Sequence, residues 1–128
     1  MGNGMMTITT AHTIDADTYH ELQEIMADEF TELLDVFHQD VVAAIDALQQ
    51  SITQGDSQQV GIICHKLKSS SRLIGAFGMA ELARLLEEYK DDQDQIRAMQ
   101  HWQQLNTTYA EVCVWLNAHA PIVTALSA

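Results

Sequence analysis

The sequence predicts an all-α protein, folded as an up-down-up-down antiparallel four-helix bundle with a short extra helix at its N-terminal end. The 128-residue chain has 47% hydrophobic residues, six glycines and one proline, a composition that suits long uninterrupted helices better than a turn-rich sheet. Apolar residues recur at spacings of three and four along four substantial segments. The connections between these segments are short, which favours antiparallel packing of consecutive helices.

The chain has the length of a single domain with one hydrophobic core. Residues 1–14 are small, polar and aperiodic, so we expect a flexible N-terminal tail. Residues 15–120 contain all the periodic segments and are predicted to form the bundle domain, followed by a C-terminal tail at residues 121–128.

The first two predicted helices lie in the acidic N-terminal half of the chain. Asp15 or Asp17 is a candidate N-cap for the short leading helix. Its apolar positions are Tyr19, Leu22, Ile25 and Met26. A helix of more than twenty residues follows and ends near Gly55. Its apolar positions are Phe30, Leu33, Leu34, Phe37, Val41, Ala44, Ile45, Leu48 and Ile52.

Three more helices complete the bundle. Asp56 is the expected N-cap of the next helix, and Gly75 to Gly78 are expected to turn the chain at its end. Its apolar stripe consists of Val60, Ile63, Leu67 and Ile74. The following helix carries Met79, Leu82, Ala83, Leu85 and Leu86 and ends in the polar run 90–94. The last helix carries Ile96, Met99, Trp102, Leu105, Tyr109, Val112, Cys113 and Leu116, with Pro121 beyond its end.

Charge is distributed unevenly along the chain, whose formal net charge is −12. Residues 1–64 contain eleven acidic residues and no lysine or arginine, and Lys66, Lys68 and Arg72 then follow within seven residues. Such an acidic surface repels phosphate backbones and anionic lipids, so nucleic acid and membranes are not expected partners. The cationic cluster indicates a specific site, with a solvated helix face as the alternative interpretation.

The two cysteines, Cys64 and Cys113, form neither a disulfide framework nor a metal-binding CxxC motif. They are expected to be small, mostly buried residues in a reducing compartment. The N-terminus has neither the basic region of a signal peptide nor an apolar run long enough to span a membrane. We therefore expect a cytoplasmic location.

His65 shares its helix with several small and cationic residues. At about 100° per residue, Lys68, Ser69 and Arg72 fall on the same side of the helix as His65. The apolar stripe of this helix lies roughly half a turn away. His65 is therefore predicted to face out of the core.

A dinuclear metal site is one alternative, because four-helix bundles hold such sites with Glu-x-x-His pairs. The nearest matches are Asp17-x-x-His20 and Asp35-x-x-His38, and no further inward-facing acid is evident. Such spacings also arise by chance in an acidic helical protein, so no metal is expected. The histidines expected to be surface or rim residues are His12, His20, His38, His101 and His119.

A hydrolytic nucleophile is another alternative, since Ser69, Ser70 and Ser71 lie close to His65 in sequence. Ser70 and Ser71 are predicted to point toward the core, and no nearby acid is placed to orient the imidazole. Cys64 precedes His65, but adjacent helical residues point about 100° apart. Neither pairing makes a convincing dyad.

Transient phosphorylation suits an exposed histidine beside a lysine. A neutral imidazole nitrogen is nucleophilic near physiological pH, and the phosphoryl group that it accepts is strongly negative. Lys68 one turn on, and Arg72 a further turn away, can pair with the phosphoryl oxygens. Small residues at Gly61 and Ser69, four positions on either side of His65, would let the active site of a partner close over the ring.

This segment resembles the core motif of the histidine-containing phosphotransfer (HPt) domain family, which reads approximately His-x-Leu-Lys-Gly-Ser-Ser-x-x-x-Gly-Ala. The matching residues are His65, Leu67, Lys68, Ser70, Ser71, Gly75 and Ala76. The upstream Glu32-Leu33-Leu34-x-x-Phe37-x-x-Asp40 and the downstream Leu85-Leu86-Glu87 also look like the family. The resemblance covers roughly residues 15–120 and implies an HPt-like four-helix bundle.

The resemblance implies that His65 accepts the phosphoryl group through its Nε2 and that Lys68 neutralises the charge. Glu87 occupies the position from which a side chain of family members often hydrogen-bonds the other ring nitrogen, so it is expected to orient the imidazole. Related proteins frequently have Gln at this position. Ser69 replaces the usual glycine of the family. It is still small, and its hydroxyl is a candidate for tuning the lifetime of the phosphohistidine.

The resemblance also implies partners, namely response-regulator receiver domains and hybrid histidine kinases, with Mg²⁺ bound by the receiver and no cofactor of the chain's own. Ile62 is the best candidate for an apolar docking contact, and Phe37 is a weaker one. The other residues expected at the interface are Gly61, Ser69 and Arg72. The sequence has no kinase-type glycine-rich nucleotide loop, so autonomous phosphorylation from ATP is not expected.

The predicted function is that of a monomeric phosphorelay intermediate, which accepts a phosphoryl group from a receiver aspartate onto His65 and passes it to another receiver. The runner-up is a phosphorylation-independent helical adaptor that binds a receiver or a kinase as an inhibitor. A dinuclear metal-binding bundle is a more distant alternative.

Overall fold

The structure, a computed structural model, describes residues 13–119, which contain helices and turns and no strand. The elements are α2 (Ala16–Met26), the 3₁₀ turn η1 (Ala27–Glu29), α3 (Phe30–Gln54), α4 (Ser57–Ile74), α5 (Phe77–Glu87), α6 (Tyr89–Asp92) and α7 (Gln95–His119). None of these helices combines the length and the hydropathy that crossing a membrane requires. The features predicted for residues 1–12 and 120–128, among them His12, Pro121, most of the N-terminal tail and all of the C-terminal tail, lie outside the described residues. The predicted boundary of the N-terminal tail at residue 14 is wrong, because Ile14 is 2% exposed and packs in the core.

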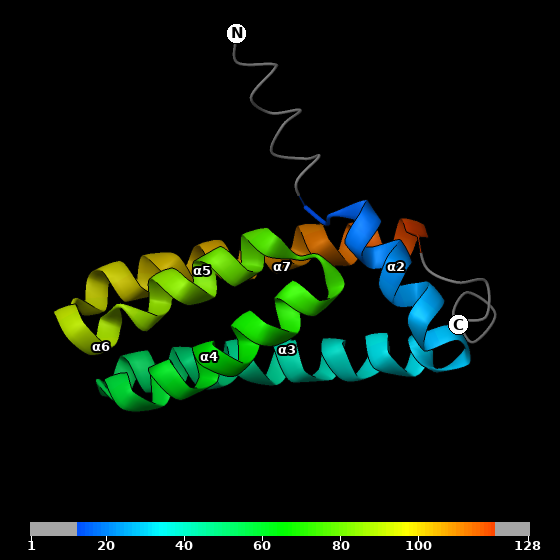
Figure 1. Ribbon diagram of the computed structural model, residues 1–128. Helices are drawn as coiled ribbons and strands as arrows, with labels where there is room; N and C mark the ends of the chain where they lie inside the picture. The colour runs from blue at the N-terminus through cyan, green and yellow to red at the C-terminus, as the bar shows by residue number, and fades with distance from the viewer. Residues whose placement is uncertain (1–12, 120–128) are drawn as a thin grey trace, which may run out of the picture.

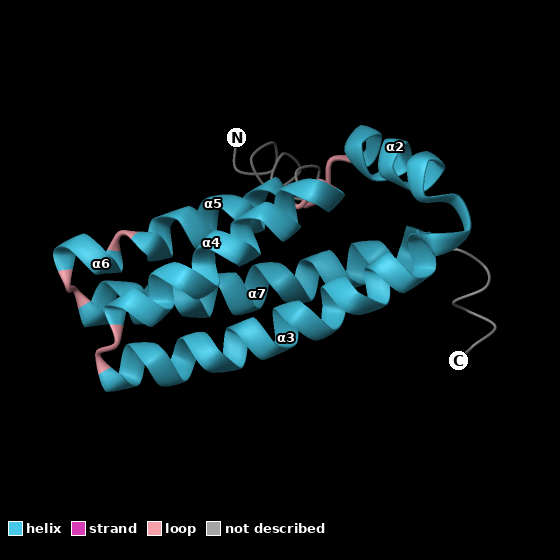
Figure 2. Ribbon diagram, turned by 60° about the horizontal axis from the view of Figure 1, so that its bottom comes forward, coloured by secondary structure: helices cyan, strands magenta, loops and turns pink. Residues whose placement is uncertain are grey.

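Helices α3, α4, α5 and α7 form the predicted up-down-up-down antiparallel bundle (Figure 1). Helix α4 packs against α3 and α5, and α7 packs against the same two helices. The short helix α2 lies across the end of the bundle where α4 turns into α5, as predicted for the leading helix (Figures 1 and 2). It is tied there by the Asp15 N–H, which donates to the Gly75 carbonyl at 2.8 Å.

Aspartates begin two helices and a glycine ends another where the sequence predicts. Of the two candidate caps of α2, Asp15 is the one used, and its carboxylate accepts from the Thr18 N–H at 3.0 Å. Asp56 caps α4 by accepting from the Gln59 N–H at 3.1 Å. Gly55 ends α3 in the left-handed region at a φ of 74°, which costs glycine no steric strain.

The connection around α5 and α6 differs from the prediction at both ends. The turn after α4 is confined to Gly75 and Ala76, because α5 already begins at Phe77. At the other end, α5 stops at Glu87, and α6 forms a separate turn at Tyr89. The Glu88 N–H bonds the Leu85 carbonyl, a tighter spacing than in an α-helix. This break lets Tyr89 turn into the core, where it is 4% exposed.

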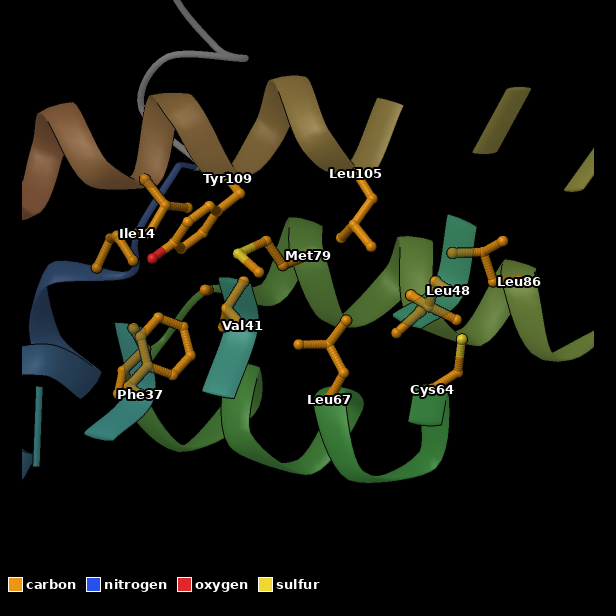
Figure 3. Close-up of a cluster of buried hydrophobic side chains, with 14 of the residues drawn as sticks. Ile14, Phe37, Val41, Leu48, Cys64, Leu67, Met79, Leu86, Leu105 and Tyr109 are labelled. Atoms are coloured by element: carbon orange, nitrogen blue, oxygen red, sulfur yellow. The ribbon is translucent and has the colours of Figure 1, made fainter. Parts of the chain in front are cut away.

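The core lies along the axis of the bundle and receives side chains from all four long helices (Figure 3). The residues labelled there are Ile14, Phe37, Val41, Leu48, Cys64, Leu67, Met79, Leu86, Leu105 and Tyr109. Trp102 of α7 adds a polar tie, because its indole N–H donates to the Ile45 carbonyl of α3 at 2.7 Å. The apolar stripes read from the sequence therefore meet in one continuous core, except at Ile25 and Ile96, which the periodicity predicts to be buried but which are 72% and 76% exposed.

Phe37 belongs to this core, and the expectation that it forms an exposed docking contact is wrong. Its side chain is 5% exposed, and its ring centroid lies 6.4 Å from that of Tyr109 on α7. The reason is its register, since Phe37 and Val41 are four residues apart and occupy the same buried face of α3.

Phe37→Ala should lower the free energy of unfolding by about 3–5 kcal/mol, because it removes a buried ring and leaves a cavity. The matched control is Val36→Ala, a truncation of the neighbouring side chain, which is 47% exposed. That change should stay within about 0.5 kcal/mol. Urea denaturation of both variants measures the difference, and equal stabilities would contradict the packing of Phe37.

Candidate functional site

Helix α4 presents His65 on the face opposite its packed stripe. Val60, Cys64, Leu67 and Ile74 are each at most 4% exposed, whereas His65 is exposed. Figure 3 shows Cys64 and Leu67 pointing into the bundle. The prediction that His65 faces out of the core is therefore confirmed.

His65 lines a shallow hollow of about 570 Å³, formed by three helices. Helix α4 contributes Gln58, Gly61, Ile62 and His65, α5 contributes Glu87 and α6 contributes Lys90. Ile62 is 65% exposed, so it offers an apolar surface one turn from the imidazole, as predicted for a docking contact. The hollow thus combines a nucleophilic nitrogen, an exposed apolar side chain and charges of both signs.

An ion pair between Lys68 and Glu87 joins α4, which carries His65, to α5. The Lys68 Nζ donates to the Glu87 Oε1 at 2.7 Å, and each side chain is 20% exposed. Lys68 is therefore less exposed than expected, because its ammonium is bound to the last residue of α5. In residues 13–119, the recorded hydrogen bond of the Glu87 carboxylate goes to Lys68 and not to the His65 ring.

Ser69 and Arg72 follow His65 along the exposed face of α4. The Ser69 hydroxyl donates to the His65 carbonyl at 3.3 Å, so it is engaged with the backbone and stays away from the ring. Arg72 does not line the hollow. Its charge acts on α5, where a hydrogen bond from Arg84, and to a smaller extent the charge of Arg72, lower the pKa of Glu81.

Gly61 is buried, and the expectation that it leaves open space for a partner is wrong. A Cβ atom placed on Gly61 would lie 2.5 Å from Cδ and 3.2 Å from Cε of Lys90. The aliphatic stem of Lys90 therefore occupies the space that the missing side chain leaves. Sequence reasoning missed Lys90, and the available signal was its position three residues after Glu87.

The serine and cysteine side chains near His65 are poorly placed for nucleophilic catalysis. Burial, with the charge of Glu87 adding and that of Lys68 opposing, raises the pKa of the Cys64 thiol to about 12, so the thiol stays protonated near neutral pH. Ser71 is fully buried, and its hydroxyl has no hydrogen-bond partner within residues 13–119. These placements agree with the prediction that neither residue forms a dyad with His65.

The histidines of the candidate metal pairs are engaged in other contacts. His20 lies against Gln23, with its Nδ1 3.4 Å from the amide oxygen, and His38 contacts the Tyr109 hydroxyl. Among the residues that the structure describes, no three histidine, cysteine, aspartate or glutamate side chains are grouped to hold a metal ion.

Comparison with known proteins agrees with this geometry. A family model described as "Hpt domain" matches residues 32–115, which is more than half of the chain. The crystal structure of histidine-containing phosphotransfer protein B (HptB) from Pseudomonas aeruginosa PAO1 is similar, with 28% identity and a TM-score of 0.80 over 85% of this chain and 95% of that chain. Curated protein sequences give no match. The chain therefore belongs to the Hpt domain family and is a histidine phosphotransfer intermediate of a phosphorelay.

Proposed function

We propose that His65 carries the phosphoryl group on its Nε2, taken from the aspartyl phosphate of one receiver domain and passed to the aspartate of another. In the first step, the Nε2 lone pair attacks phosphorus while the proton remains on Nδ1. A P–N bond forms, the acyl P–O bond breaks, and the aspartate carboxylate leaves with the bonding electrons. The observation that carries the proposal is an exposed imidazole in a hollow that Glu87 and Lys90 also line, with Lys68 bound to that glutamate.

Lys68 and Glu87 act together on the charge of the phosphoryl group. A phosphoryl group brings roughly 1.5 to 2 negative charges, and Lys68 is a cation already bound to Glu87, which lines the hollow with His65. Glu87 holds Lys68 through Oε1, which leaves Oε2 for the Nδ1–H of His65 and so for orienting the imidazole. Glu87 therefore positions Lys68 and also competes with the phosphoryl oxygens for it.

The partners that we propose are receiver domains, whether free-standing or attached to hybrid histidine kinases. Ile62 is exposed beside His65 and supplies an apolar contact for a receiver surface, and Ser69 and Arg72 continue that face of α4. The receiver brings the Mg²⁺ that its own aspartate site requires, and this chain contributes no cofactor. We further propose that the protein acts as a monomer in the cytoplasm and has no kinase activity of its own.

The direct test incubates the purified protein with a ³²P-phosphorylated receiver domain and follows the label. Wild-type protein should gain phosphate that is labile in acid and stable in base, as expected for a phosphohistidine, and His65→Gln should gain none. The control is His101→Gln, which removes a histidine outside the hollow. Equal labelling of wild type and His65→Gln would contradict the site, and binding without labelling would favour the adaptor function.

The competition for Lys68 predicts that substitution of Glu87 and substitution of Lys68 shift the transfer equilibrium in opposite directions. Glu87→Gln should shift the transfer equilibrium toward the phosphorylated protein by about 1 kcal/mol, roughly fivefold, because the freed Lys68 pairs with the phosphoryl group. Lys68→Ala should shift it toward the receiver by a similar factor. The ratio of the two phosphoproteins at equilibrium, measured by ³¹P NMR, gives both values.

The matched control for Glu87→Gln is Glu88→Gln, the same change at the next residue. The Glu88 carboxylate pairs with Arg84 and Arg97 and does not line the hollow. Glu88→Gln should leave the ratio within about twofold of wild type. A loss of phosphorylated protein in Glu87→Gln would contradict the competition between this carboxylate and the phosphoryl group.

A further inference from the structure

We propose that Lys90 of α6 is a phosphoryl-binding residue, whose ammonium pairs with the phosphoryl oxygens on His65 and which is seated there by Gly61. The proposal rests on the proposed function of His65 and extends it. It adds a second cation to the site, from a helix that carries none of the motif residues.

The position of Lys90 puts its ammonium within reach of a phosphoryl group on His65. The aliphatic stem of Lys90 runs over Gly61, with Cγ, Cδ and Cε all within 3.2 Å of where a Cβ atom would be. Gly61 and His65 are four residues apart on one helix face, so their Cβ positions are roughly 5–6 Å apart. Lys90 and His65 line the same hollow. Rotation about the last two bonds of Lys90 therefore brings its ammonium to a phosphoryl group on Nε2.

The lack of an ion-pair partner for Lys90 among the described residues suits this role. Lys68 is bound to Glu87, Arg84 pairs with Glu81 and Glu88, and Arg97 pairs with Glu88 and Asp92. Lys90 forms no ion pair within residues 13–119, so its charge at the hollow is not neutralised by a neighbour. A phosphoryl group of nearly two negative charges exceeds what a shared Lys68 can balance. Lys90 is the lysine that remains available within the hollow.

The glycine at position 61 is explained by the same contact. Glycine weakens the interior of a helix relative to alanine, so its presence in the middle of α4 needs a structural reason. A methyl group at this position would lie 2.5 Å from the Lys90 Cδ, and the stem would have to move. Gly61 thus keeps Lys90 against α4 and next to His65.

The first test compares Lys90→Gln and Lys90→Arg with Lys66→Gln in the transfer equilibrium with a phosphorylated receiver. Lys66 neighbours His65 in sequence but lines a separate groove between α3 and α4, so it controls for net charge. Lys90→Gln should shift the equilibrium toward the receiver by about three- to tenfold, and Lys66→Gln by less than about twofold. Lys90→Arg should restore most of the wild-type value.

A second measurement separates charge pairing from a structural role. In ³¹P NMR titrations, Lys90→Gln should raise the pKa of the phosphoryl group on His65, because the lost cation favoured its dianion. Lys66→Gln should leave this pKa close to the wild-type value. Equal phosphoryl pKa values and equal equilibria in Lys90→Gln and Lys66→Gln would overturn the role of Lys90 while leaving phosphorylation of His65 intact.

Gly61→Ala tests, through a double-mutant comparison, whether Gly61 positions Lys90. Gly61→Ala should weaken the phosphorylated state in the wild-type background and add nothing in the Lys90→Gln background. An equal effect in both backgrounds would overturn the coupling and assign Gly61 to the approach of the partner. A wild-type protein that takes no phosphate on His65 from any receiver would overturn the proposed function and this inference together.

Discussion

The packing of α4 determines where the chemistry takes place. One face of this helix is fixed by Val60, Cys64, Leu67 and Ile74, all buried between α3 and α5. Rotation of α4 by one residue, about 100°, would move Cys64 out of the core and bring His65 toward it. Because burying the polar imidazole without a partner costs free energy, the stripe holds the helix in the orientation that exposes His65.

The charges around His65 suit a carrier that must release what it accepts. In the proposed mechanism, a phosphoryl group on His65 gains Lys68 only by competing with Glu87, which already binds this lysine at 2.7 Å. The proposed role of Lys90 adds a further attraction, through a side chain whose stem lies over Gly61. We propose that the opposing effects of the carboxylate and the lysines keep the phosphorylated state from becoming too stable to pass its phosphoryl group onward.

The local features of the fold could be predicted from the sequence. Gly55 and Asp56 end one helix and begin the next through bonds within a few residues, and the stripe of α4 follows from the helical period. The features that could not be predicted depend on contacts between distant segments. The pairing of Lys68 with Glu87 and the seat of Lys90 on Gly61 each need the packed arrangement of α4 against α5 and α6.

The central claim is that the phosphoryl group is bonded to Nε2 of His65. Heteronuclear NMR of the phosphorylated protein with ¹⁵N-labelled histidine rings detects the coupling between phosphorus and the nitrogen that carries it. The account predicts a one-bond coupling at a single ring nitrogen, Nε2 of His65. Coupling at Nδ1, at another histidine, or at no histidine of a phosphorylated sample would contradict it.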